Sequence, residues 1–485
     1  MTTAVNTQNP ADTQAQERLA LWLIAAQSFF IAPVGTLTKI VADTVFLSYF
    51  GAELLPVTYI VMGIVVVLLS SSIIIVQRRY SFAAIAITTF VVLTIVYTAA
   101  WLILRSPNGQ WVSFVLVLME PINVLLALSI MVGGQAGKIF NVRQMKRLFP
   151  IVTGASFAGS TAIAFLAPWL PGGSQNLLLW VAGLVVVTLI FLLVMRQRFR
   201  SALVQKQTTS SSSAPSKPIK EILRSRYTLN LTSYQMLSAV GTQLVVYIFM
   251  ALAAVQFEGN EEGLLSFLGI FLGVKNGVGF IVQMSLAGYL LTKFGLRLGL
   301  MLNPVVIGLA AVALALWALG FGAAGTVLFA MAVGAQFLDF LLSYAITGTS
   351  IKAAYQALPV DERTVVEATV EGIGFPMAIS LTGVFLIIVN ALPWLSLTHI
   401  MWFTVLVCIL WTWSAWQAYG NYKGALLKTL RRRVLGEAEL TLNDASSLAT
   451  VEALVESKQL SSALTMIRKT PVSEMAMGKP MPSTV

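Results

Sequence analysis

The 485-residue sequence is poor in the residues that most soluble proteins and metalloproteins depend on. It has one cysteine, Cys408, and one histidine, His399, which excludes a disulfide framework, a thiolate metal site and a multi-histidine metal site. Only 11% of the residues are charged and 57% are hydrophobic, whereas soluble chains have about 25% charged and about 45–50% apolar residues. So little charge cannot cover a soluble surface of this size. The mean hydropathy of +0.82 agrees, and the composition predicts a polytopic membrane protein.

Apolar runs of membrane-spanning length recur along the chain, each with the roughly 20 residues that a helix needs to cross a bilayer. They are continuously apolar rather than alternating, which excludes a membrane β-barrel. We therefore predict an all-α protein with twelve transmembrane helices, over residues 19–42, 54–77, 82–104, 110–137, 149–170, 176–195, 227–255, 263–292, 296–318, 321–351, 364–391 and 397–419.

The loop charges indicate which end of these helices faces the cytoplasm. Lysines and arginines gather in every second loop, in the stretch between the sixth and seventh helices and after the last helix. The opposite loops hold Glu53, Glu258, Glu261 and Glu262, with Arg105 as their only base. Because cytoplasmic loops collect Lys and Arg, both termini are predicted in the cytoplasm of a bacterial inner membrane. The same rule explains the net charge of +11, and no nucleic-acid partner is expected.

The chain divides into two halves of six helices. Residues 1–18 are a polar cytoplasmic segment without the features of a cleavable signal peptide. Residues 19–195 and 227–419 form the two halves, joined by a basic, serine-rich linker over 196–226. Residues 420–485 are predicted to form a cytoplasmic helical tail with a disordered end. Two six-helix halves around a basic linker are the layout of major-facilitator transporters, whose halves rock about a site at the membrane midplane.

Ionisable residues at membrane depth are the candidates for a substrate or ion site, because they are costly there. The sequence has few of them: Lys39, Asp43, Glu120, Lys275 and Asp339. Lys39 and Asp43 are four apart and can neutralise each other, which fits a structural pair as well as a ligand site. Lys275 needs an anion at its depth, and we expect either Asp339 or a substrate to supply it.

Charged residues nearer the cytoplasm are candidates for the entrance to the site. They are Lys138 after the fourth helix, with Glu367 and Glu371 on one face near the start of the eleventh. Motifs of soluble enzymes fail, since Gly133 to Lys138 ends in Gly-Lys but Ile139 replaces the hydroxyl residue that a phosphate loop needs. We therefore expect no enzyme activity, no catalytic residues, no metal and no cofactor.

One stretch of the sequence contains specific motifs in addition to its apolar composition. It contains Glu120-Pro121, then Gly133-Gly134-Gln135, then Gln144-Met145-Lys146-Arg147-Leu148-Phe149-Pro150, then Gly154-Ala155-Ser156. It resembles the ATP/ADP carrier family of plastids and intracellular bacteria and its relatives in free-living bacteria. Weaker similarity lies in Ala42 to Ser48 and in Tyr355 to Pro359. The resemblance covers most of residues 19–420, and the tail from Leu440 to Lys469 is similar to the start of a helical array of the HEAT type.

The resemblance implies the major-facilitator fold and transport by alternating access. The nucleotide carriers place lysines early in the eleventh helix, where this chain has Val365 and Glu367. Its membrane core keeps only Lys39 and Lys275 as bases, fewer than a polyphosphate needs. We therefore predict a secondary transporter of a small, anionic solute.

Three functions compete at this stage. They are nucleotide exchange, ion-coupled transport of another solute, and a non-transporting membrane anchor or sensor whose tail binds a protein partner. A water-accessible polar space between the halves would favour transport. A core sealed by apolar side chains, with Lys275 bound to Asp339, would favour the anchor or sensor.

Overall fold

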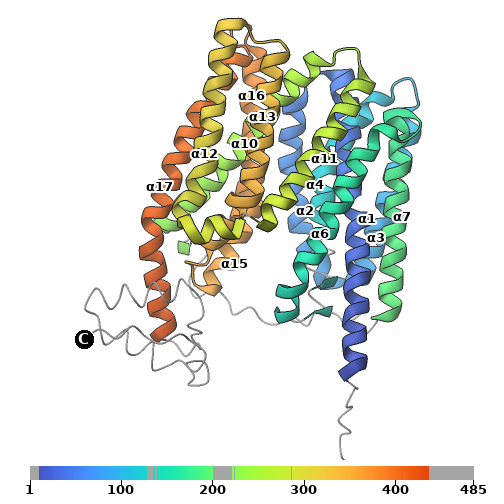
Figure 1. The fold of residues 1–485 in the computed structure, drawn as a ribbon, viewed down its shortest axis with the longest axis vertical. Helices are drawn as coiled ribbons and strands as arrows, with labels where there is room; N and C mark the ends of the chain where they lie inside the picture. Colours follow the sequence, from blue (N-terminus) through green and yellow to red (C-terminus); the bar gives the residue numbers. More distant parts are fainter. Residues whose placement is uncertain are drawn as a thin grey trace, which may run out of the picture.

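The computed structural model describes residues 10–127, 135–136, 139–140, 142–199, 221–222, 224–285 and 287–435. Within these ranges the protein is entirely helical and contains no strand (Figure 1). Eleven of the described helices are long and apolar enough to span a membrane. The described part of α4 supplies the twelfth, so the predicted fold class is confirmed.

Among the described residues, the N-terminal half is a bundle of six long helices. Its helices are α1 (Pro10–Phe50), α2 (Leu55–Arg79), α3 (Phe82–Leu104), α4 (Val112–Ala127), α6 (Val142–Leu166) and α7 (Gly173–Arg198), with short 3-10 turns at Gly109–Trp111 and Ala167–Trp169. The long α1 begins before the predicted start at residue 19 and continues past the predicted end at residue 42.

The C-terminal half contains more interruptions. Its helices are α10 (Arg226–Gln256), α11 (Glu261–Ser285), α12 (Ala287–Phe321), α13 (Thr326–Leu342), α14 (Gly348–Tyr355), α15 (Val360–Thr369), α16 (Phe375–Ala391) and α17 (Leu397–Leu435). The predicted helices over residues 321–351 and 364–391 are each interrupted by a π-helical segment, at Ser343–Thr347 and Val370–Gly374.

Two predicted helix ends in this half are wrong. The predicted helix over residues 263–292 ends at Ser285, and α12 then bends at Gly295, whose φ of 71° favours glycine. The last helix runs past residue 419 to Leu435, so the first part of the predicted tail continues α17. The HEAT-like segment and the predicted disordered end lie outside the described residues.

Prolines inside the helices create points of close helix packing. A proline has no N–H to bond the carbonyl four residues earlier. Pro33 thereby frees the Phe29 carbonyl of α1, and Gly159 of α6 packs directly against that oxygen. Pro168 frees the Ala164 carbonyl in the same way, and Gly269 of α11 packs there. These contacts hold α6 against α1 on one side and against α11 on the other.

The Gly159→Ala variant is expected to lower the thermal unfolding midpoint of the purified protein. A Cβ at this position would lie 2.0 Å from the Phe29 carbonyl oxygen, which is backbone and moves only with its helix. Overpacking of this kind costs about 1–3 kcal/mol. The matched control is Gly183→Ala on α7, where a Cβ meets nothing within 4 Å. Equal midpoints for the two variants would contradict the packing argument.

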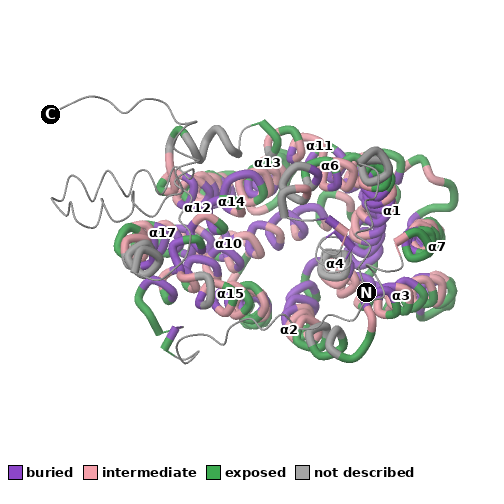
Figure 2. Tube along the Cα trace, turned by 90° about the horizontal axis from the view of Figure 1, so that it is seen from below, coloured by how far each residue is buried: buried purple, intermediate pink, exposed green. Residues whose placement is uncertain are grey.

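The two halves lie side by side and meet along two pairs of helices (Figure 1). α2 packs against α16 and α6 against α11, while α1 also contacts α11. Seen along the bundle, buried residues lie on the helix faces turned toward neighbouring helices (Figure 2). We call the end at which α1 begins and α17 ends the terminal end, at the bottom of Figure 1.

Among the described residues, three side-chain hydrogen bonds join the halves toward the opposite end. Ser174 at the start of α7 donates to the carboxylate of Glu261 at the start of α11. The Asn390 amide of α16 donates to the Glu53 carbonyl (3.4 Å), and the Ser380 hydroxyl to the Ile60 carbonyl of α2 (3.0 Å). These contacts close the bundle at the end opposite the terminal end.

Candidate functional site

The N-terminal half contributes a triad of charged residues. The ammonium of Lys39 on α1 lies 3.1 Å from Asp43 Oδ2, one turn further along the same helix. It also lies 2.9 Å from Glu120 Oε2 on α4, and Glu120 is 81 residues further along the chain. The predicted neutralisation of Lys39 by Asp43 is confirmed, and Glu120 joins the pair. One base between two acids gives the triad a formal negative charge.

A second layer of hydrogen bonds holds this triad in place. The Tyr97 hydroxyl of α3 lies 3.0 Å from Thr38 Oγ1 and 2.6 Å from Asn123 Nδ2. Thr38 precedes Lys39 on α1, and Asn123 lies three residues after Glu120 on α4. The network ties α1, α3 and α4 together and fixes the backbones that carry Lys39 and Glu120. The sequence interpretation missed these residues, because neutral side chains inside an apolar helix give no signal of which partner they meet.

The C-terminal half contributes Lys275, near the middle of α11. This residue is only 8% exposed. Its ammonium lies 4.5 Å from the centre of the Phe340 ring and 5.6 Å from that of Phe271, which is cation–π range. Among the residues that the structure describes, no carboxylate forms an ion pair with it. Lys39, Asp43, Glu120 and Asp339 all lie within electrostatic range of Lys275.

Asp339 on α13 does not neutralise Lys275. Its Oδ1 atom faces three neutral groups instead, namely the Thr242 hydroxyl at 3.2 Å, the Asn303 amide at 3.5 Å and the Ser343 hydroxyl at 3.4 Å. The residue is 1% exposed. The expected pairing of Lys275 with Asp339 is therefore absent from the described contacts, and Lys275 is left without a carboxylate partner.

The triad and Lys275 belong to different halves but lie within electrostatic range of each other. Side-chain exposure is 21% for Lys39 and 28% for Glu120, although both belong to the centre of the bundle. Tyr344, in the π-helical segment of the C-terminal half, is 53% exposed. It nevertheless lies within electrostatic range of Glu120 in the other half. Partly exposed groups of the two halves therefore lie near each other at this level of the bundle.

The predicted entrance residues are only partly described. Lys138 lies outside the described residues. Glu367 lies at the end of α15, partly buried, and Glu371 is exposed in the π-helical segment that follows. The two glutamates influence each other electrostatically, as expected for residues one turn apart. They lie nearer the terminal end than the triad does, as an entrance would.

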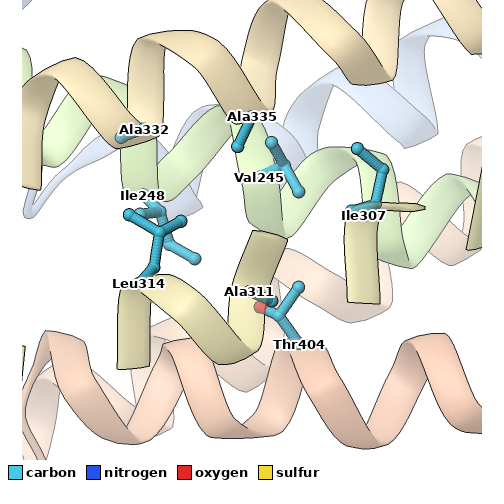
Figure 3. A pocket seen from close by; sticks show the side chains of 8 residues that line it. All are labelled: Val245, Ile248, Ile307, Ala311, Leu314, Ala332, Ala335 and Thr404. Atoms are coloured by element: carbon cyan, nitrogen blue, oxygen red, sulfur yellow. The ribbon is translucent and has the colours of Figure 1, made fainter. Parts of the chain in front are cut away.

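A separate apolar void lies inside the C-terminal half (Figure 3). It measures about 10 Å³, room for a single water-sized molecule. Its lining residues are Val245, Ile248, Ile307, Ala311, Leu314, Ala332, Ala335 and Thr404. The void is too small and too apolar to hold a charged solute, so it is not the candidate site.

No protein-family model and no curated protein matches the chain. Solved structures do match, among them three transporters with low sequence identity to the chain. The nucleoside transporter NupG, as its D323A mutant, aligns with a TM-score of 0.62 and 12% identity, over 83% of this chain and all of that one. A bacterial homologue of the iron transporter ferroportin, in its inward-facing state, aligns with a TM-score of 0.60 and 15% identity, over 82% of this chain and 98% of that one.

A third match is a POT family transporter in complex with 5-aminolevulinic acid. It aligns with a TM-score of 0.58 and 10% identity, over 83% of this chain and 96% of that one. At such identities the likeness shows the fold alone. The chain is a multi-pass membrane protein with the fold of major-facilitator-type transporters.

Proposed function

We propose that the protein is a secondary transporter that moves a small anionic solute by alternating access, and that it is related to the ATP/ADP carriers. The observation that carries the proposal is Lys275, an ammonium at mid-bundle depth without an acidic partner among the described residues. A buried charge persists only when a partner compensates it. A bound anion between the halves is such a partner.

The aromatic residues around Lys275 support a solute with an apolar body. Phe271 and Phe340 flank the ammonium, and the Tyr344 ring is tilted against Phe340 with 4.6 Å between the ring centres. The triad across the interface presents two acids to one base, which repels a solute with several negative charges. A monoanion could place its charge on Lys275 and its apolar body against the rings, and its single charge would limit repulsion by the two acids of the triad.

The loop charges support a cytoplasmic terminal end. With that topology, the hydrogen bonds of Ser174, Ser380 and Asn390 close the outer side of the bundle. The ferroportin homologue aligns less well in its outward-facing state, with a TM-score of 0.51, than in its inward-facing state, with 0.60. Both observations favour an inward-facing conformation.

Uptake by the purified full-length protein in proteoliposomes tests the function. Labelled benzoate, lactate, ADP and ATP are offered with and without a proton or sodium gradient, and empty liposomes serve as the control. Saturable uptake of a monocarboxylate would support the proposal. Exchange of ATP for ADP would instead support the nucleotide-carrier function, which the motif from Gln144 to Pro150 favours. No uptake of any anion by folded protein would contradict transport of an anionic solute.

The alternative of a non-transporting anchor or sensor has less support. It required Lys275 to be neutralised by Asp339, and the described contacts of Asp339 are with neutral groups instead. A protein partner for the tail stays a prediction.

The Glu261→Gln variant is expected to favour the outward-facing conformation. A neutral amide weakens the bond with Ser174 that holds α11 to α7 on the outer side. Tyr344→Cys in a Cys408→Ala background reports the change, because the chain has no other cysteine. Labelling by an impermeant maleimide from the cytoplasmic side should slow severalfold. The control is Glu262→Gln, at the exposed neighbouring position. Equal labelling rates in the two variants would contradict the role of the Ser174–Glu261 hydrogen bond in holding the outer side closed.

A further inference from the structure

Asp339 lies in the interior of the C-terminal half, where it is 1% exposed. Four elements surround its carboxylate: α10 through Thr242, α12 through Asn303, α13 itself, and the π-helical segment through Ser343. Such segments often occur at functional sites. An ionised carboxylate at this depth requires a compensating positive charge. The described contacts of Asp339 supply only neutral groups.

The distances around this carboxylate are too long for the strong hydrogen bonds that would compensate it. Hydroxyl groups that donate to a carboxylate lie at about 2.5–2.7 Å, and N–H groups with one charged partner at about 2.7–2.9 Å. Here the corresponding separations are 3.2 and 3.4 Å for the hydroxyls and 3.5 Å for the amide. The polar atoms therefore surround Asp339 Oδ1 but form only long hydrogen bonds with it.

This spacing matches the ligand shell of a cation. Oxygen ligands at the 2.3–2.6 Å typical of Ca²⁺ are about 3.3–3.7 Å apart when they subtend a right angle at the ion. Na⁺ has nearly the same radius. Mg²⁺, with ligands at about 2.0–2.1 Å, would draw them to about 2.9 Å, closer than the Thr242 and Ser343 hydroxyls lie to Asp339 Oδ1.

Asn303 provides a second, independent sign of a missing ligand. The residue is fully buried, and its Oδ1 atom accepts no hydrogen bond in the described structure. Its Nδ2 atom contacts both Ser343 Oγ, at 2.9 Å, and Asp339. Rotation of the amide by half a turn would bring the unpartnered oxygen to the same place. The void of Figure 3 begins about one turn away on three of these helices.

The charge of the site selects a monovalent ion. One carboxylate neutralises one positive charge, and Lys275 already places an ammonium within electrostatic range. A divalent ion would leave a second uncompensated charge in the membrane core. We propose that Asp339, Asn303, Ser343 and Thr242 form a binding site for Na⁺ inside the C-terminal half. The inference does not depend on the proposed transport function, since binding of Na⁺ is measurable without any solute.

Thermal unfolding of the purified full-length protein tests the site. NaCl is titrated against choline chloride at constant ionic strength, with KCl as the comparison salt. Na⁺ should raise the midpoint saturably by about 5 °C, since a ligand that binds only the folded state stabilises it. K⁺ should have a much smaller effect. Asp339→Asn should abolish the response yet unfold in choline no earlier than the wild type, because it removes an uncompensated acid. Ser343→Ala should raise the half-saturating Na⁺ concentration about tenfold.

The matched control is Thr404→Val, which removes a buried hydroxyl that bonds only the Ile400 carbonyl of its own helix. This variant should keep the full response to Na⁺. A wild-type midpoint that does not distinguish Na⁺ from choline would overturn the site, and so would a Na⁺ response that survives Asp339→Asn. Stabilisation by acid alone, lost in Asp339→Asn, would assign a proton instead and also overturn the proposal.

Discussion

Replacing Lys275 with glutamine is expected to abolish solute uptake and at the same time to stabilise the protein. The side chain is 8% exposed and has no acidic partner among the described residues, so its charge weakens the folded state in the absence of solute. A charged side chain at the centre of a membrane helix costs about 2.5–3.5 kcal/mol, and the rings of Phe271 and Phe340 offset part of this. A net gain of about 1–2 kcal/mol remains for the glutamine variant.

The combination of lost uptake and a higher unfolding midpoint separates a binding residue from a structural one. Uptake in proteoliposomes and thermal unfolding in detergent are measured on the same preparation. Lys275→Arg should keep measurable uptake, because it keeps the charge. Lys423→Gln, at an exposed position of α17, should change neither quantity. A glutamine variant that unfolds earlier than the wild type would show that Lys275 has a stabilising partner, and the anion-binding role would be lost.

The residues of the candidate site were largely predictable, because ionisable side chains at membrane depth carry a high free-energy cost and are therefore rare. Few charges occur at membrane depth, so Lys39, Asp43, Glu120, Lys275 and Asp339 could be named from the sequence alone. The contact between Lys39 and Asp43 followed from helical spacing. The contact of Lys39 with Glu120 did not, because it depends on how α4 packs against α1.

The helix packing also decides which charges pair. Lys275 and Asp339 are opposite charges at similar depth, and sequence reasoning joined them. In the folded chain, Asp339 turns toward α10 and α12, whereas Lys275 on α11 lies beside Phe340. Neutral residues such as Tyr97, Asn303 and Tyr344 were missed for a related reason. Their importance arises from the residues that they contact, and the apolar sequence around them does not indicate which positions face lipid and which face another helix.

Replacing Lys39 with methionine is expected to have the opposite effect on stability from the change at Lys275. Methionine keeps the length of the side chain but leaves Asp43 and Glu120 facing each other without a base. Removing one partner of a buried ion pair costs about 3–5 kcal/mol. Because Lys39 and Glu120 keep 21% and 28% exposure, we expect about 2–3 kcal/mol here. Uptake should fall to background, and the unfolding midpoint should fall with it.

A neutral form of the triad distinguishes the charge effect from a packing effect. Adding Asp43→Asn and Glu120→Gln to Lys39→Met removes both unpaired acids, and replacing a whole buried ion network is often neutral for stability. The triple variant should therefore recover most of the lost midpoint but none of the uptake, because the charges that face Lys275 are gone. Its recovery would show that the triad serves solute handling rather than folding. A triple variant as unstable as Lys39→Met would show instead that α1 and α4 depend on the lysine side chain itself, and one that regains uptake would exclude the triad from the transport site.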